Sequence, residues 1–490
     1  MIQTEIAVLR FGLGARPGDL AAAAGDPRGW LMGQIKGAAP LAGNTPLAAS
    51  DEIFTELLSA RGKFQEMKRE AAAQPSADPH SSIDPKAAAA PAFNPVRDAY
   101  LPHYRAQVLA RAQSAALTAR PFAERLVHFW TNHFAVSADK AALFGVAGTL
   151  ENEAIRPHVD GRFVDLLTAV EQHPAMIGFL DNQYSVGKDS DLSRLAARRA
   201  EARPFARQRM VTPDKPRREF GINENLAREI LELHTLGVNG GYTQNDVTTF
   251  AQIITGWSIG GGKGRLAGGA PGRFYFRDNL HEPGAKTFMG KTYYESGLRQ
   301  GEAVLADLAR QPATAHFIAT KLVRHFVADD PPPAAVERVA RAFLKGGGDL
   351  PTVYAALIEA PEAWDADMRK FKTPEDLVFS TLRALNVSPR QPEEVVRSFD
   401  FLGQRQYTPG SPAGWPDTSK GWDGSDALMH RVLWASRVAG RYEQGIDPVD
   451  LAASCLGAYA RPDTVTALRR ASSSTQALAL LLMSPEFQRR

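Results

Sequence analysis

The stretch GINENLAREILELHTLGVNGGYTQNDVTTFAQIITGWSI, residues 221–259, carries the densest structural pattern in the chain. Apolar residues recur there with the helical period at Leu226, Ile230 and Leu233, which therefore share one face of a predicted helix. Gly237 predicts the end of this helix, because a residue without a Cβ adopts the left-handed conformation at the lowest cost. The pattern therefore predicts an amphipathic helix followed by a tight turn.

A second helix is predicted directly after this turn. Thr243 followed by Asp246 matches a capping box, in which each side chain satisfies a free backbone N–H group of the first helical turn. The first helix also carries a polar stripe beside its apolar face, formed by Asn225, Arg228, Glu229 and Glu232. Two carboxylates, an amide and a guanidinium on one stripe make this helix a candidate functional site.

The remaining chain predicts a mainly α fold, a multi-helical bundle with a small β-hairpin insertion. Helical periodicity is strong over residues 104–130, 297–326 and 334–364. Residues 273–293 instead alternate aromatic and polar residues on both sides of a Pro-Gly pair, which is typical of a β-hairpin. His281 falls at the expected tip of that hairpin.

Composition divides the chain into four expected parts. Residues 71–95 are rich in Ala, Pro, Ser and Asp and bury too little apolar surface to offset their ordering entropy, so they predict a linker or surface loop. The expected parts are an N-terminal helical segment at 1–70, this linker, a central helical domain with the candidate site at 96–400, and C-terminal loops and helices at 401–490.

Composition also excludes several classes of protein. A net charge of +3 over 490 residues gives no case for a nucleic-acid binder. A single cysteine, Cys455, rules out a disulfide framework or a cysteine-rich zinc site. No apolar run approaches the roughly 20 residues that span a bilayer. Glu5 and Arg10 interrupt the first apolar run, so no signal peptide is visible and a cytoplasmic location is expected, with export as the alternative.

Candidate side chains also lie outside the central stretch. The segment ERLVHFWTNHFAVS places Arg125, His128 and Asn132 on adjacent helical turns, with Trp130 and His133 at the helix end. A histidine in such a place is usually a structural one, and the alternative is a side chain that reaches a cleft.

Asp181 offers the same two possibilities, since it closes an apolar run. It either belongs to a helix C-terminal turn or points into the same cleft as the other candidates.

Two further segments bear on the substrate. Residues 193–218 contain nine Lys and Arg residues with few acids between them, which indicates either a solvated segment or a lid that attracts an anion. The segment GQRQYTPGSPAGWPDTSKGW carries Trp415 and Trp422. Exposed tryptophan rings stack on sugar faces, although a buried loop that plugs the bundle is the commoner arrangement.

Nine sequence segments together resemble those of a known family. RFGLGARPGDL, HFWTNHFAVS, FLDNQYS, GINENLAREILELHTLGVNGGYTQNDV, ITGWS, HEPGAKTFMGK, KLVRHFV, GQRQYTPGSPAGWP and SPEFQ are similar to those of the bacterial domain of unknown function 1800 family. The resemblance runs nearly end to end and implies no established activity. It implies a bacterial protein, often exported and commonly encoded beside a secreted protein that resembles sulfatases and phosphatases.

We weigh two functions. The first is a hydrolase-like enzyme on an envelope or extracellular polysaccharide, or another anionic substrate. A helical cleft would hold its catalytic residues Glu229, His281, Asp181 and His133. Its substrate-binding residues are expected to be Asn225, Arg228, Glu232, Asn132, Trp130 and Trp415. Such histidines and carboxylates either exchange protons or bind a divalent metal. A polysaccharide lyase, with His133 as the base, is a variant of this hypothesis.

The second function is a non-catalytic scaffold that partners the sulfatase-like protein. Under this hypothesis the polar stripe is structural, and Arg228 forms i,i+4 ion pairs with Glu224 and Glu232.

Overall fold

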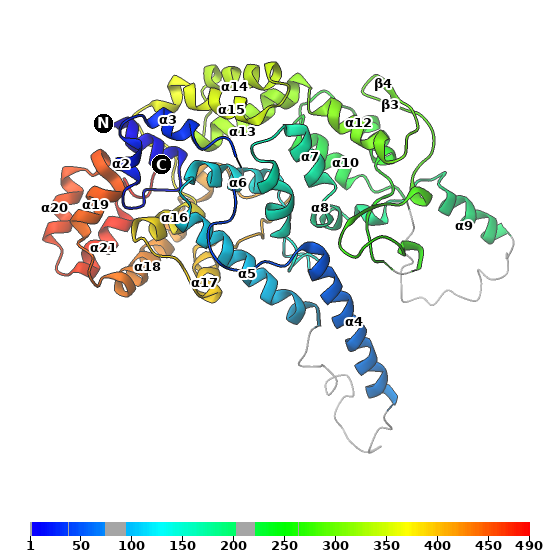
Figure 1. Ribbon diagram of the computed structural model, residues 1–490, viewed down its shortest axis with the longest axis horizontal. Coiled ribbons are helices and arrows are strands. Elements are labelled where there is room, and N and C mark those ends of the chain that lie inside the picture. Colours follow the sequence, from blue (N-terminus) through cyan, green and yellow to red (C-terminus); the bar gives the residue numbers. More distant parts are fainter. Residues whose placement is uncertain (1, 38, 74–94, 202–220, 263) are drawn as a thin grey trace.

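The computed structural model describes residues 2–37, 39–73, 95–201, 221–262 and 264–490 (Figure 1). These residues are mainly helical and include two antiparallel two-stranded ladders, β1 (Trp257–Ile259) with β2 (Phe274–Phe276) and β3 (Lys286–Phe288) with β4 (Lys291–Tyr293). The predicted mainly α fold with a small hairpin insertion is therefore confirmed.

Helix α6 (Pro121–His133) lies at the centre of the fold and is buried at nearly every position. It starts with a proline, whose fixed φ suits the first helical turn. It packs against the π-helical segments η1 (Ile6–Phe11) and η2 (Glu151–Ile155) and against α5 (Pro95–Leu117). This burial holds the α6 side chains in fixed positions.

Four successive helices lie along the upper side of the molecule in Figure 1. They are α12 (Leu298–Leu308), α13 (Pro312–Phe326), α14 (Pro333–Lys345) and α15 (Leu350–Glu359). Each neighbouring pair from α13 to α15 packs together, and each of these three helices has a proline in its first turn. The short 3-10 turn η9 (Pro361–Trp364) ends this layer.

The last quarter of the chain forms a second helical group. It contains α16 (Pro374–Ala384), α17 (Pro392–Leu402), α18 (Ser425–Tyr442), α19 (Pro448–Leu456), α20 (Pro462–Arg470) and α21 (Ser474–Met483). The last residues return to the middle of the chain, where Phe371 and Arg489 form a β-bridge. The start of the chain, α1 (Ile2–Glu5), packs beside η11 (Gly457–Tyr459), so both ends of the sequence lie in the same part of the molecule (Figure 1).

A third group surrounds the two β-ladders. It contains η3 (Arg156–His158), α7 (Phe163–Glu171), α8 (Pro174–Phe179), η4 (Asn182–Tyr184), α9 (Asp191–Glu201), α10 (Asn225–Glu229), η6 (Ile230–His234), α11 (Gln244–Ile253), η7 (Gly264–Leu266) and η8 (Asp278–Leu280). The predicted capping box of α11 is present, with Thr243 and Asp246 in the expected roles. Gly237 has a φ of 81°, as expected past a helix end.

The first helix of this central unit differs from the prediction. Instead of one α-helix, α10 continues into the π-helical segment η6. A π turn holds one extra residue, so it rotates the following side chains relative to an α-helix. As a result Leu231 and His234 are buried, whereas the predicted core residue Leu233 is only half-buried.

One buried apolar cluster extends from Ile6 to Phe487. It contains residues of the α12–α15 layer, of the C-terminal helices and of the elements around the two β-ladders. The division into parts at residues 70, 95 and 400 stays a prediction. Most of the predicted linker at 71–95 and of the basic segment at 193–218 lies outside the described residues.

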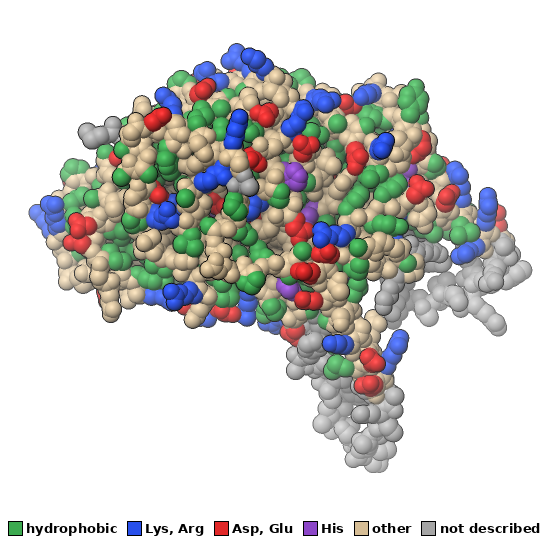
Figure 2. All heavy atoms as spheres, in the orientation of Figure 1, with side chains coloured by type: hydrophobic (Ala, Val, Ile, Leu, Met, Phe, Trp, Pro, Cys, Tyr) green, Lys and Arg blue, Asp and Glu red, His purple; other side chains and the backbone are tan. Residues whose placement is uncertain are grey.

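Helices α4 (Ser50–Ala73) and α5 pack together and extend from the body (Figure 1). The remaining short elements are α2 (Asp19–Ala23), α3 (Pro27–Met32) and η10 (Ser419–Gly421). Over the described chain no helix has the length and apolar character needed to cross a membrane. Acidic, basic and hydrophobic side chains are interspersed on the face seen in Figure 2, in keeping with the small net charge.

Candidate functional site

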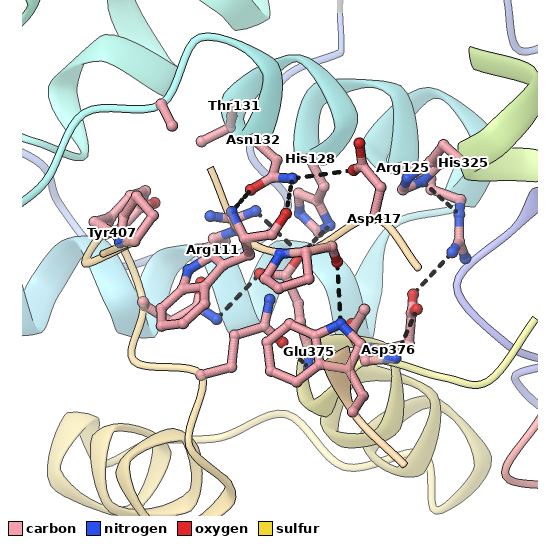
Figure 3. A pocket seen from close by; sticks show the side chains of 18 of the residues that line it. Arg111, Arg125, His128, Thr131, Asn132, His325, Glu375, Asp376, Tyr407 and Asp417 are labelled. Carbon is pink, nitrogen blue, oxygen red and sulfur yellow. Dashed lines mark hydrogen bonds and ion pairs between the residues drawn. The ribbon is translucent and has the colours of Figure 1, made fainter. Parts of the chain in front are cut away.

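A cavity with about 70 Å³ of space for water-sized molecules, open on one side, lies between α6, the start of α16 and the loop at residues 403–424 (Figure 3). Its lining combines polar and aromatic side chains from distant parts of the sequence. They include Arg111, Arg125, His128, Asn132, His325, Lys370, Glu375, Asp376, Gln404, Gln406, Tyr407, Trp415, Asp417, Trp422 and Arg490.

Helix α6 supplies one wall of the cavity. Arg125, His128 and Asn132 are three and four residues apart, so the helical period places them on one face. The start of α16 supplies another wall through Glu375 and Asp376. Its first turn is fixed by a capping box between Thr373 and Asp376, which holds both carboxylates in place.

The loop at 403–424 covers the cavity and is tied to α6 through Asn132. The Asn132 side chain accepts a hydrogen bond from the Trp415 backbone N–H (2.7 Å) and donates one to the Trp415 carbonyl oxygen (3.0 Å). Gly414 has a φ of 82°, and a Cβ there would lie 2.3 Å from the Asn132 carbonyl oxygen. The tryptophan rings of the loop, Trp415 and Trp422, lie 5.9 Å apart between centroids.

A buried charge network lies behind the cavity wall. Arg156 donates two hydrogen bonds to Glu124 (2.6 and 2.9 Å) and one to Glu151 (3.2 Å). Burial works to raise the pKa of Glu124, but the charge and hydrogen bonds of Arg156, aided by His128, outweigh it and hold that pKa below its usual value. Glu124 is therefore a permanent negative charge beside His128.

His128 lies between two carboxylates. Its Nε2 atom is 3.5 Å from Glu124 Oε1, and its Nδ1 atom is 3.5 Å from Glu375 Oε1. Glu375 also accepts hydrogen bonds from Arg111 (3.2 Å) and Gln406 (3.0 Å). Burial lowers the pKa of Arg111, but Glu151 and Glu375 outweigh this effect and raise it, so Arg111 stays charged.

Several buried polar atoms around this cavity have no hydrogen-bond partner among the described residues. They are Arg111 Nε, Gln406 Oε1 and the Tyr407 hydroxyl. Tyr407 also has a φ of 56°, a left-handed conformation that non-glycine residues rarely adopt. Unsatisfied polar groups and backbone strain both cost folding free energy, and both concentrate at functional sites. The wall of the cavity is therefore strongly polar.

The other end of the cavity is basic. Arg125 and Arg490 each donate to a different oxygen of Asp376, both at 2.8 Å. Lys370 donates to Asp329 (2.6 Å). Burial works to raise the pKa of Asp376, but the two guanidinium groups outweigh it and hold that pKa below its usual value.

Among the residues predicted from sequence, Asn132 and Trp415 line this cavity. Trp130 lies next to it in sequence but is fully buried, and its Nε1 atom donates to the Tyr354 hydroxyl (2.7 Å). The Asn132 amide holds the loop backbone.

The structure brings His133 and Glu229 near His234, which the sequence pattern does not mark as a site residue. The His133 Nε2 atom lies 3.2 Å from the His234 carbonyl oxygen. The His234 Nδ1 atom lies 2.8 Å from Glu171, and both side chains are fully buried. Burial raises the pKa of Glu229 and lowers that of His133. Only the π turn of η6, which the sequence pattern does not reveal, turns His234 inward.

The polar stripe of α10 and η6 is internally paired. Arg228 lies 3.1 Å from Glu224 and 3.3 Å from Glu232, both at i,i+4 spacing. These are the ion pairs expected if the stripe is structural. Asn225 is exposed.

His281 and Asp181 lie elsewhere. The prediction that His281 occupies a hairpin tip is wrong, because the segment forms two separate ladders and His281 lies on the connection between β2 and β3. Its Nε2 atom is 3.2 Å from Glu295, and its Nδ1 atom is 3.0 Å from the Thr255 carbonyl oxygen. Asp181 pairs with Lys140 at 2.8 Å.

The possible metal site has no ready-made ligand set in the part of the chain that the structure describes. No group of three or more His, Cys, Asp or Glu side chains is arranged there to hold a metal ion.

Fold and cavity together define a mainly α protein with a polar, aromatic-rimmed pocket between its central helix and a C-terminal loop. The chain belongs to the family described as "Protein of unknown function (DUF1800)", whose family model matches residues 6–489. No curated protein and no solved structure matches the chain.

Proposed function

We propose that this protein is a hydrolase-like enzyme that acts on a polysaccharide, with the cavity between α6, α16 and the loop at 403–424 as its active site. The observation that carries the proposal is the position of His128 in the cavity wall, 3.5 Å from the Glu124 carboxylate on one side and 3.5 Å from the Glu375 carboxylate on the other.

His128 is the group that moves protons in this proposal. An imidazole ring can both accept and donate a proton, and the carboxylate neighbours of His128 fix the orientation of its ring. Glu124 is buried and held ionised, so it acts as the fixed orienting charge. Glu375 lines the cavity and faces the other ring nitrogen. In this proposal Glu375 contacts the substrate or the attacking water.

Tyr407 and Arg111 suit the stabilisation of negative charge on a substrate oxygen. Burial raises the pKa of Tyr407 well above its usual value, so its hydroxyl stays protonated and able to donate. Arg111 lies over the Tyr407 ring, with its guanidinium carbon 5.3 Å from the ring centroid.

The aromatic rim supports a carbohydrate as the substrate. Trp415 and Trp422 both line the cavity, and the Trp415 side chain is only half-buried. An indole ring offers a flat apolar face, and the polar atoms deeper in the cavity suit sugar hydroxyl groups. An envelope polysaccharide would be met outside the cytoplasm, which favours export.

The test is release of new reducing ends from a panel of purified bacterial envelope polysaccharides. The wild-type chain is compared with Glu375→Gln and with the control Glu337→Gln, which changes an exposed glutamate paired with His316. We expect wild type and control to release product from at least one polysaccharide, and Glu375→Gln to lose at least about a hundredfold in rate. Equal activity of both variants, or no product from any substrate, would refute the proposal.

A non-catalytic partner of a sulfatase-like protein is the second candidate. The paired stripe supports it, because Arg228 directs its guanidinium group to its own helix neighbours Glu224 and Glu232. Co-purification with the protein encoded next to it is the test of this role.

Catalytic or metal-binding roles for Glu229, His281, Asp181 and His133 stay predictions. Metal analysis of the wild-type chain and of Glu229→Gln tests the metal version. A bound divalent ion that is lost in the variant would support it, and no ion in either protein would remove it.

A further inference from the structure

We propose that the outward face of α18 is an interface for a second copy of this chain, and that two copies pair there with their α18 helices antiparallel. The inference is independent of the proposed function, because it concerns the outer surface of the C-terminal helices and not the cavity. Helix α18 lies at the lower edge of that part of the molecule (Figure 1).

The inner face of α18 is held firmly in the fold. Its buried side chains are Arg431, Trp434, Ala435 and Ala439. The helix packs against α17 and α21. Arg431 donates hydrogen bonds to the Gln488 side chain (2.8 Å) and to the Lys372 carbonyl oxygen (2.7 Å). These contacts fix the orientation of the helix, so its outer face always points away from the core.

The outer face of α18 is apolar at its centre. Four large apolar side chains within six residues are exposed: Leu428 (38%), Met429 (57%), Val432 (43%) and Leu433 (44%). Their spacing of i, i+1, i+4 and i+5 places them on one side of the helix. Leu480 of the neighbouring α21 is exposed as well. A group of large apolar side chains on the surface is typical of a protein–protein interface.

Opposite charges lie on the two sides of this apolar group. Asp426 precedes it and Arg437 follows it, and both side chains are exposed. They are eleven positions apart, which is about three helical turns, so they project from the same flank of the helix. Arg437 lies over the Phe401 ring, with its guanidinium carbon 4.3 Å from the ring centroid. Within the described part of the chain, neither Asp426 nor Arg437 forms an ion pair.

This surface is complementary to a second copy of itself. In an antiparallel pair related by a two-fold axis, each flank of one helix meets the same flank of the other, with the order of residues reversed. The midpoint between Asp426 and Arg437 falls beside Val432, within the apolar group. Each Asp426 therefore faces the partner's Arg437. Met429 packs against the partner's Leu433, so two symmetric ion pairs flank one apolar contact.

The charges disfavour a lipid surface as the occupant of this face. Asp423 and Asp426 are both exposed at the start of α18, and the anionic head groups of a membrane repel carboxylates. A pair of helix faces buries an area at the lower end of stable interfaces. We therefore expect a reversible dimer with a dissociation constant in the micromolar range.

The test is sedimentation velocity of the full chain over a concentration series from about 1 to about 200 µM, which spans the affinity expected for an interface of this size. Wild type is compared with Leu433→Glu and with the control Leu344→Glu, which changes a leucine of α14 with the same exposed fraction, 44%. Both positions are exposed, so both variants are expected to fold. We expect wild type and control to dimerise and Leu433→Glu to stay monomeric. A monomeric wild type, or a Leu433→Glu variant that dimerises equally well, would overturn the proposal.

Charge reversal tests the antiparallel arrangement. Asp426→Arg and Arg437→Asp each place like charges face to face at both symmetric positions, so each single variant should raise the dissociation constant about tenfold or more. The double variant restores opposite charges and should return the dissociation constant to within about threefold of wild type. A double variant as weak as the single ones would contradict the antiparallel pairing. A monomeric wild type that instead floats with phosphatidylglycerol vesicles would assign this face to a lipid surface and exclude the second copy.

Discussion

Removal of the Tyr407 hydroxyl group, compared with removal of the Tyr354 hydroxyl group, tests whether the cavity is a functional site or part of an ordinary core. Tyr407 is buried, its hydroxyl has no hydrogen-bond partner, and its φ is left-handed. Tyr354 is also fully buried, but its hydroxyl accepts from Trp130 Nε1 (2.7 Å) and donates to the Val159 carbonyl oxygen (2.9 Å). The two tyrosines therefore form a matched pair, one without partners and one with two.

The expected magnitudes follow from these contacts. Tyr407→Phe removes a buried polar group that costs about 1–3 kcal/mol when unpaired, so we expect the free energy of unfolding to rise by about 1 kcal/mol. Tyr354→Phe breaks two hydrogen bonds of about 1 kcal/mol each and leaves the Trp130 N–H unpaired, so we expect a loss of about 2 kcal/mol or more.

Urea denaturation followed by circular dichroism measures both changes, provided that the slope m is unchanged. Activity on the polysaccharide identified by the panel is measured in parallel. We expect it to fall about tenfold or more in Tyr407→Phe and to stay near wild type in Tyr354→Phe. A loss of 1 kcal/mol or more in Tyr407→Phe would show that the hydroxyl has a structural partner, and the reasoning from unpaired atoms would then fail.

Three further predictions concern the same region. Arg156→Met leaves the Glu124 and Glu151 carboxylates buried without their main partner, so it should cost about 3–5 kcal/mol in urea denaturation, and a loss under 1 kcal/mol would contradict the buried network. Burial lowers the pKa of Lys372 from 10.5 to about 7, so between pH 7 and 10.5 the unfolded state binds more protons than the folded state and the free energy of unfolding rises with pH. Lys372→Met should flatten this slope, and an unchanged slope would argue against the pKa shift. Gly414→Ala should loosen the loop at 403–424, because the new Cβ would meet Asn132 and the φ of residue 414 is positive, whereas a Cβ at Gly410 meets nothing within 4 Å. Limited proteolysis of the loop compares Gly414→Ala with Gly410→Ala, and equal cleavage would contradict the role of Gly414.

Local patterns in the sequence predicted much of the fold. The capping box at Thr243 and the glycine at 237 lie within one helix–turn–helix unit, and both were confirmed. The π turn of η6 was not predictable, because a sequence with α-helical periodicity does not show where an extra residue enters the turn. That single residue moved Leu233 partly out of the core and placed His234 inside it.

The candidate site was harder to predict because it is assembled over long sequence distances. Asn132 and Trp415 were selected, and the spacing of Arg125, His128 and Asn132 on α6 was visible in the sequence. Their partners were not, since Arg111, Glu375 and Arg490 reach the cavity only through the packing of α5, α16 and the last residues. The capping box of α16, Thr373 with Asp376, was one signal that could have drawn attention to that segment.

The most direct test of the central claim is a hydrogen-exchange comparison of the full chain with and without bound oligosaccharides from a bacterial envelope digest. Binding in the cavity predicts slower exchange in the loop at 403–424 and at the end of α6, with no change over α10 and η6. Protection confined to residues 225–236 or around His281, with none in the loop, would contradict the account.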